Sequence, residues 1–183
     1  MPEIETARLW LKPYTEDDLE ELSVILSNPE VMKYSPRGPI PKEKVKQVTQ
    51  EILEFFIQHW KQHRFGVWAV VGKLTGKLLG HCGLNFLPNS PEVEVLYRLD
   101  QGYWNQGIAT EATKASLRYG FEEVKLDKIV AITAPEHLAS RRVMEKAGLK
   151  YEKDAHFYNS DVVYYALARK AWQPDDSLYI LQT

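Results

Sequence analysis

The segment Trp104–Ala112, with the sequence WNQGIATEA, has the residue types that can bind an anion through backbone groups. Gly107 has no Cβ, so another group can approach the chain closely there, and Ala109 keeps the next turn small. The segment joins an expected strand to an expected helix, and the free amides and dipole of a helix start favour an anion such as a pyrophosphate. An ordinary turn with a helix cap is the alternative, since the segment is neither a P-loop nor a three-glycine dinucleotide motif.

A second segment, Pro135–Leu149, also follows an expected strand and opens an expected helix. Two such junctions can place two helix starts around one ligand. The second helix carries Arg141, Arg142 and Lys146, which could meet a phosphate group. A solvated helix face is the alternative interpretation of these three cations.

Periodicity and turn residues predict the elements that must position these segments. The spacing of apolar residues predicts helices, and short apolar runs between turn residues predict strands. Expected strands are 6–13, 67–71, 78–86, 92–99, 128–133, 151–154 and 162–168, and expected helices are 15–26, 42–63, 111–121 and 137–147. Along the chain these elements follow the order β-α-α-β-β-β-α-β-α-β-β. This order predicts a mixed α/β or α+β fold.

Composition limits the classes of function. The chain has 183 residues, with 23 Lys and Arg against 25 Asp and Glu, and this net charge of −2 argues against a nucleic-acid-binding protein. A single cysteine, Cys82, fits a reducing compartment. No run approaches the roughly 18 apolar residues of a membrane span. We therefore expect a soluble, cytoplasmic protein with one domain, residues 1–183, that binds neither nucleic acid nor membrane.

We expect no metal site. His59 and His63 are four apart on a helix, but Trp60 stands where a zinc-binding His-Glu-x-x-His motif has its glutamate, and no third ligand is evident. His81 and Cys82 are adjacent in a strand, so their side chains point to opposite faces and do not form a nucleophile pair.

Four stretches in this order resemble the GCN5-related N-acetyltransferase (GNAT) superfamily, and within it the RimJ/RimL-like branch. They are Glu5–Pro13, Glu94–Tyr97, Trp104–Ala112 and Ala139–Leu149. The resemblance spans about residues 5–170, which leaves 171–183 as a C-terminal tail. It implies a mostly antiparallel central sheet with two splayed parallel strands and flanking helices, and it implies an enzyme that transfers an acetyl group.

The resemblance also implies where acetyl-CoA, as co-substrate, binds. The backbone of the strand 93–99 pairs with the pantetheine arm, which makes Arg98 and Leu99 the expected contacts. The following loop wraps the pyrophosphate, and Ser140 and His137 face the thiol end. The loop contacts expected from the resemblance are Gln106, Gly107, Ile108, Ala109 and Thr110.

For catalysis, a base must take the proton of the acceptor amine. Glu94 is the candidate, because a carboxylate flanked by Val93, Val95 and Leu96 is expected to have a raised pKa; a solvated sheet residue paired with a cation is the alternative. Ser140 is the candidate acid or thiol partner, and an ordinary helix serine is its alternative. Many family members use a tyrosine as acid at the position of Met144, which cannot donate a proton.

By the same resemblance, Met32, Tyr34 and Trp68 line the acceptor side, although aromatic residues there also suit a core. The acceptor would be a primary amine on a protein N-terminus or a small molecule. A non-catalytic acyl-CoA-binding module is the main alternative, supported by Met144, and an unrelated nucleotide-binding protein is the weaker one. The family often forms dimers, so a homodimer is also an expectation.

Overall fold

A computed structural model describes all residues, 1–183, and contains one sheet of nine strands. The strands are β1 Glu3–Glu5, β2 Leu9–Pro13, β3 Val67–Gly72, β4 Leu78–Phe86, β5 Val93–Leu99, β6 Lys128–Thr133, β7 Lys150–Phe157, β8 Ser160–Ala168 and β9 Ile180–Gln182. The helices are α1 Leu19–Ser27, α2 Pro29–Met32, α3 Val45–His63, α4 Ile108–Glu122 and α5 Leu138–Lys146. Short 3₁₀ turns are Glu16–Asp18, Lys42–Lys44, Gln101–Tyr103 and Arg169–Ala171.

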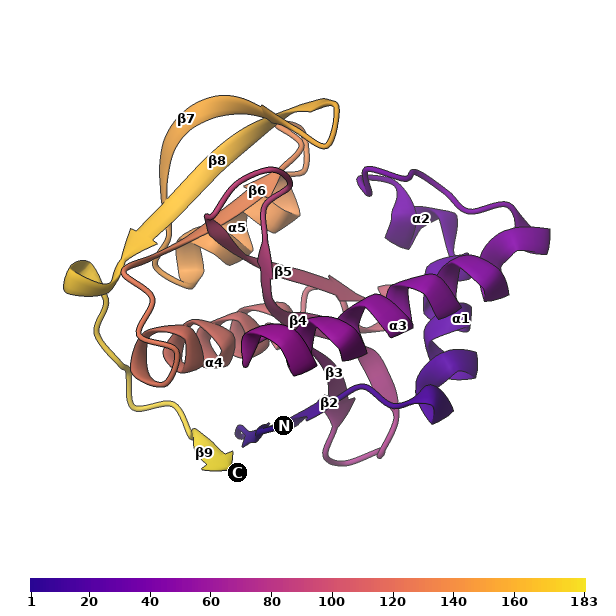
Figure 1. The fold of residues 1–183 in the computed structure, drawn as a ribbon, viewed down its shortest axis with the longest axis horizontal. Coiled ribbons are helices and arrows are strands. Elements are labelled where there is room, and N and C mark those ends of the chain that lie inside the picture. Colours follow the sequence, from indigo (N-terminus) through magenta and orange to yellow (C-terminus); the bar gives the residue numbers. More distant parts are fainter.

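The strands lie in the order β7-β8-β6-β5-β4-β3-β2-β1-β9, and neighbours are antiparallel except β5 and β6 (Figure 1). The helices flank this sheet, with α1, α2 and α3 in the first half of the chain and α4 and α5 in the second. The expected fold class, a mixed and mostly antiparallel sheet with one parallel pair, is therefore confirmed.

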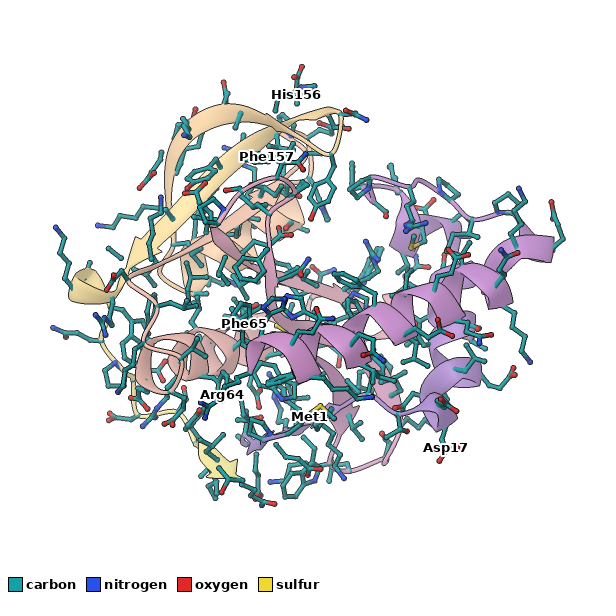
Figure 2. The ribbon with its side chains drawn as sticks, viewed as in Figure 1. Met1, Asp17, Arg64, Phe65, His156 and Phe157 are labelled. Carbon is teal, nitrogen blue, oxygen red and sulfur yellow. The ribbon has the colours of Figure 1, made fainter.

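Alternation along the strands places a core on each face of the sheet, because successive side chains of a strand point to opposite faces. Cys82 and Val95 belong to the larger core, which includes residues of α4 and α5. Val67 and Ala69 belong to a second core with residues of α1, α2 and α3. His81, next to Cys82, faces the ring of Phe56 on α3. Side chains fill the layers between the sheet and its helices (Figure 2).

The C-terminal residues return to the sheet rather than leaving it. β9 pairs antiparallel with β1, which sequence patterns did not predict. Before β9 the segment contacts α4 twice. Asp175 forms an ion pair of 2.6 Å with Lys114, and the guanidinium of Arg118 lies 4.5 Å from the ring centre of Tyr179. These contacts join the tail at 171–183 to the helix that follows the glycine loop.

Most expected elements are present, with shifted ends. The expected helix 111–121 begins earlier, at Ile108, directly after Gly107. The expected strands 151–154 and 162–168 are longer and form the β7–β8 hairpin. α2 is a separate short helix that begins at Pro29, capped by the side chain of Asn28, which accepts from the Glu30 amide at 3.0 Å. None of the helices is long and apolar enough to cross a membrane.

Candidate active site

The parallel strands β5 and β6 share a single register pair, Glu94 with Val130. β5 continues from Val95 to Leu99 with β4 as its partner on the other side, and no residue of β6 pairs with that stretch. The two strands therefore part after Glu94. This leaves one backbone edge of β5 without a strand partner, and an extended ligand can pair with such an edge.

Glu94 lies at the point where the strands part and is 4% exposed. Its Oε1 accepts a hydrogen bond of 2.8 Å from the hydroxyl of Tyr158. Burial raises the pKa of Glu94 to about 7, although the Tyr158 hydrogen bond acts in the opposite direction. A carboxyl group with this pKa is suited to accept and release a proton near neutral pH.

Tyr158 reaches Glu94 from the turn of the β7–β8 hairpin. Tyr158 and Asn159 both have positive φ, 52° and 56°, and they form the two-residue connection between the strands. Positive φ at both central residues is the geometry of a hairpin turn that matches strand twist, and it is uncommon for tyrosine. The only sequence signal for this contact is the short polar turn between two strands, so sequence reasoning missed Tyr158.

The glycine loop has the geometry of an anion site. Gly107 has φ of 77°, a left-handed conformation that favours glycine, and it directly precedes α4. The first intrahelical bond runs from the Glu111 amide to the Gly107 carbonyl, and no side chain caps the helix. The amides of Ile108, Ala109 and Thr110 precede this bond, so the helix leaves them free for an anion.

A clamp formed by Arg8 and Glu111 holds this loop against the connection between β1 and β2. Arg8 donates from Nη1 to the Gln106 carbonyl at 2.8 Å and from Nε to Glu111 Oε2 at 2.6 Å. Glu111 Oε1 also accepts from the Arg8 amide at 2.9 Å and from the Thr6 hydroxyl at 2.7 Å. Sequence reasoning placed both residues in motifs but did not predict this contact across more than 100 residues of chain.

Replacing Glu111 with alanine is expected to weaken CoA binding about tenfold, because the charge-assisted bonds that fix the loop are lost. Isothermal titration calorimetry with CoA measures the change. Glu20→Ala is the matched control: it breaks the exposed ion pair of Glu20 with Lys46, away from the loop and the cavity beside it. An unchanged affinity in Glu111→Ala, with a lowered melting temperature, would show that the clamp serves stability alone.

Ser140 and His137 lie at the start of α5 and contact opposite sides of the β5–β6 split. Ser140 is 7% exposed. Its Oγ lies 2.9 Å from the hydroxyl of Tyr97 on β5. Tyr97 also donates to the Ser140 carbonyl at 2.9 Å. Since the single Tyr97 proton is used there, the Ser140 hydroxyl is the donor to Tyr97. Tyr97 is a second site residue that sequence reasoning missed.

The His137 ring stacks on Tyr34, with ring centres 4.2 Å apart, and its Nδ1 lies 3.2 Å from the Thr133 hydroxyl. The structure thus brings a residue expected on the cofactor side against one expected on the acceptor side. Burial lowers the pKa of His137, so its imidazole is neutral at neutral pH.

The other expected site residues differ in how much of their surface is open. Met32 and Trp68 are fully buried in the two cores, and the Trp68 indole donates to the Pro2 carbonyl at 2.9 Å. These two side chains therefore offer no surface to an acceptor, whereas Tyr34 is half-buried.

Of the residues expected at the cofactor, Leu99 is buried and Arg98 is half-buried, both on β5. Met144 is 1% exposed in the larger core and is not open to any ligand.

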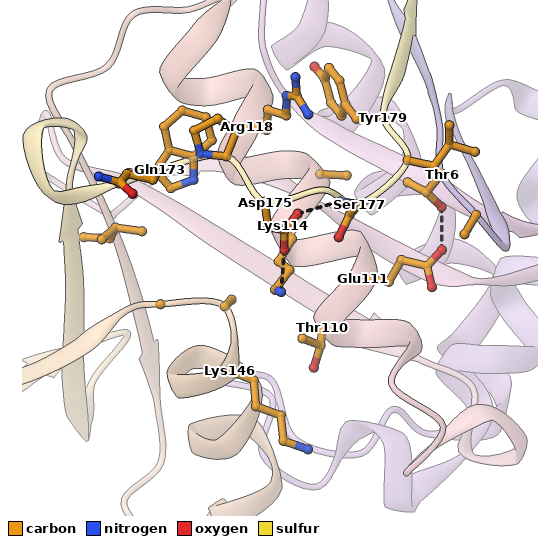
Figure 3. A pocket seen from close by; sticks show the side chains of 18 of the residues that line it. Thr6, Thr110, Glu111, Lys114, Arg118, Lys146, Gln173, Asp175, Ser177 and Tyr179 are labelled. Carbon is orange, nitrogen blue, oxygen red and sulfur yellow. Dashed lines mark hydrogen bonds and ion pairs between the residues drawn. The ribbon is translucent and has the colours of Figure 1, made fainter.

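A cavity of about 630 Å³ lies beside the start of α4, and Gly107, Thr110 and Lys146 help to line it (Figure 3). Two further cations there are already paired, Lys114 with Asp175 and Arg118 with Glu122.

Lys146 forms no ion pair. Arg141 points elsewhere, donating to the Tyr165 hydroxyl at 3.2 Å and to the Pro135 carbonyl at 3.1 Å. Of the three cations on α5, Lys146 is thus the one placed at this cavity.

Comparison with known proteins agrees with this geometry. The model of the family described as "Acetyltransferase (GNAT) domain" matches residues 8–150. The "Uncharacterized N-acetyltransferase YnaD" of Bacillus subtilis (strain 168) is 29% identical over 177 residues, which cover 92% of this chain and 98% of the relative.

Two solved structures are similar over nearly their whole length. The GNAT-family acetyltransferase from Bacillus anthracis has a TM-score of 0.76 and 28% identity, over 92% of this chain and 99% of the other. The structure of Mycobacterium smegmatis RimJ in complex with CoA-disulfide shares the fold, with a TM-score of 0.76 and 18% identity over 93% of this chain and 87% of the other. This chain, with its parted parallel strands and its glycine turn at a helix start, belongs to the GNAT acetyltransferase family.

Proposed function

We propose that the protein transfers an acetyl group from acetyl-CoA directly to a primary amine, on a protein N-terminus or a small molecule. The observation that carries the proposal is Glu94: a buried carboxyl group, with its pKa raised to about 7, at the point where β5 and β6 part. A group there can take a proton from an amine beside the edge of β5.

The residues present fit the co-substrate. The unpaired edge of β5 at Arg98 and Leu99 suits the amide groups of a pantetheine arm. The free amides after Gly107 suit a pyrophosphate, and Lys146 at the neighbouring cavity suits a further phosphate group. Acetyl-CoA supplies the acetyl group as a thioester.

In the proposed transfer, the amine nitrogen bonds to the acetyl carbonyl carbon while the carbon–sulfur bond breaks. The amine proton passes to Glu94, directly or through water, and a backbone amide near Leu96 donates to the carbonyl oxygen. To protonate the departing thiolate, the Ser140 hydroxyl breaks its bond to Tyr97 and gives its proton to the sulfur, and the serine oxygen then recovers a proton from solvent. Met144 cannot take this role because it has no proton to give and is buried.

Tyr97 is a positioning residue for Ser140 in this scheme. Its two contacts of 2.9 Å fix the Ser140 hydroxyl and the first turn of α5. Burial raises the pKa of Tyr97 well above its usual range, so the phenol remains protonated and the contacts persist through neutral pH.

Replacing Tyr158 with phenylalanine is expected to move the acidic limb of the kcat/KM–pH profile to higher pH. The lost hydrogen bond stabilised the carboxylate, so the pKa of Glu94 rises above about 7 when it is removed. Because the base works deprotonated, the rate falls most below neutral pH. Tyr151→Phe is the control, since it removes an exposed phenol of the same hairpin that contacts Asp154 instead. If the acidic limb of the profile does not move in Tyr158→Phe, the pairing of Tyr158 with Glu94 is contradicted.

The proposed function is tested by following free thiol release from acetyl-CoA with a panel of peptide and small-molecule amines. Release that depends on the amine, with the acetylated product seen by mass spectrometry, is the expected result. Tight binding of acetyl-CoA without release for any amine would favour a non-catalytic binding module. Failure to bind CoA by calorimetry would overturn the proposal and that alternative together.

A further inference from the structure

Arg98 is a charged side chain for which this protein provides no partner. It lies on β5 on the same face as Glu94 and Leu96, because side chains alternate along a strand. The residue is half-buried, and its guanidinium makes no hydrogen bond or ion pair with any residue of the protein. A guanidinium has five N–H donors, so several donors here are left for an outside group.

The groups around Arg98 are neutral. His81 is its register partner on β4, is 3% exposed, and has an Nδ1 without a hydrogen-bond partner. Burial, and next the charge of Arg98, lower the pKa of His81, so the imidazole is uncharged. Tyr14 is the other neighbour, and its hydroxyl donates to the Gly80 carbonyl at 3.2 Å. Neither residue supplies a negative charge.

Arg98 therefore stays charged although its guanidinium is poorly solvated. Burial lowers the pKa of Arg98 to about 10, which still leaves the guanidinium protonated at neutral pH. A partly buried cation without an anion is unfavourable, and an anion brought by a ligand relieves this. The planar guanidinium also matches a carboxylate in a two-bond geometry that lysine cannot offer.

A second unpaired cation lies near the expected entrance for the acceptor. The Lys33 ammonium lies 5.3 Å from the ring centre of Tyr34, which stacks on His137. Lys33 forms no ion pair. Burial is the main cause of the lowered pKa of His137; the nearby charge of Glu136 raises this pKa, and the charge of Lys33 lowers it. Against these two cations, the buried carboxyl on this face is Glu94, which is only partly ionised at neutral pH. The unpaired guanidinium of Arg98, beside a carboxyl that is only partly ionised, favours an anionic group on the acceptor over a polyamine.

We propose that the acceptor amine carries a carboxylate and that Arg98 binds this group while the amine faces Glu94. The inference rests on the proposed acetyl transfer and names its substrate class. Residues 94 and 98 are four positions apart, about 13 Å along an extended strand, and the Arg98 side chain can bend to shorten that span. An amine and a carboxylate several bonds apart, as in an ω-amino acid or a dipeptide, therefore fit better than an α-amino acid.

The test compares kcat/KM for 6-aminohexanoate, its uncharged amide 6-aminohexanamide, and the diamine 1,5-diaminopentane. Expected is a preference of at least tenfold for the carboxylate over the amide, with the diamine poorest. In Arg98→Gln this preference falls toward one, and in Arg98→Lys it is reduced but remains. Lys170→Gln, which removes an exposed cation elsewhere, keeps the wild-type preference and controls for net charge.

Other results would overturn the inference. Equal rates with the amide and the carboxylate in the wild-type protein would do so without any variant, so the test does not depend on Arg98→Gln folding. A loss of CoA affinity in Arg98→Gln, with the substrate preference retained, would show that Arg98 serves the cofactor instead. Thiol release with none of many amines would count against the proposed function itself, not only against the carboxylate.

Discussion

Replacing Glu94 with glutamine is expected to lower kcat by about 10²–10⁴, the usual contribution of a general base. Glutamine has nearly the same shape and still accepts a hydrogen bond from Tyr158, but it cannot take a proton. In the wild-type protein, kcat/KM is expected to rise with pH to a plateau above about 7, where Glu94 is ionised. In the variant, the residual rate should lose this dependence. Steady-state thiol release between pH 5.5 and 9 measures both.

The matched control is Glu92→Gln, on the loop before β5. Glu92 is paired with Lys128 at 2.7 Å and accepts from Tyr164 at 2.6 Å, and its pKa is lowered. It is ionised over the whole range, so its loss should leave the acidic limb in place. If Glu94→Gln has an unchanged rate and pH profile, Glu94 is not the general base. That result would leave the acetyl-transfer activity itself in place.

The same substitution should stabilise the fold at alkaline pH. A carboxyl whose pKa is raised from 4.5 to about 7 in the folded state contributes stability when protonated, and this is lost as pH rises through 7. Glutamine does not titrate, so the stability of Glu94→Gln relative to wild type should grow by about 3 kcal/mol between pH 4.5 and 8. Urea denaturation at both pH values measures it. Opposite changes in activity and stability are expected of a group held in place for function.

Much of the fold could be predicted from the sequence because its signals are local. The apolar spacing of α3 and the turns between β3, β4 and β5 depend on residues near one another in the chain. The glycine-bearing loop before α4 was predicted from local residue types in the same way, although the helix begins at Ile108 and not at residue 111. The position of Glu94 among apolar neighbours likewise indicated a buried carboxyl group, as the structure shows.

The partners of the site residues could not be predicted, since they depend on contacts between distant parts of the chain. Tyr158 lies 64 residues from Glu94, and Arg8 lies 103 residues from Glu111. No local pattern marks either pair. β9 was missed because a three-residue strand has too few residues for alternation to show. Met32 and Trp68 were predicted to line the acceptor side, with a place in the core as the alternative, and both are buried. Residue type alone does not separate a buried aromatic or methionine from one that lines a site.

Replacing Gly107 with valine is expected to weaken CoA binding by about two orders of magnitude. A β-branched residue is strained at φ of 77°, so the turn must change, and the amides of Ile108, Ala109 and Thr110 then lose their common direction. Each bond from an amide to a charged phosphate contributes about 1.5–3 kcal/mol, so losing one or two explains a change of this size. The new Cβ would also lie 3.4 Å from the Arg8 guanidinium, which holds the loop.

Gly76 separates the effect of strain from the effect on the anion site. It has φ of 67° in the turn before β4, and a Cβ there would meet nothing within 4 Å. Gly76→Val therefore introduces similar backbone strain at a site without free helix amides, and both variants should lose similar stability in urea denaturation. Only Gly107→Val should lose CoA affinity by calorimetry. Equal affinities in the two variants would mean that the co-substrate is not held by the amides at the start of α4, and the anion site would have to be sought elsewhere along β5.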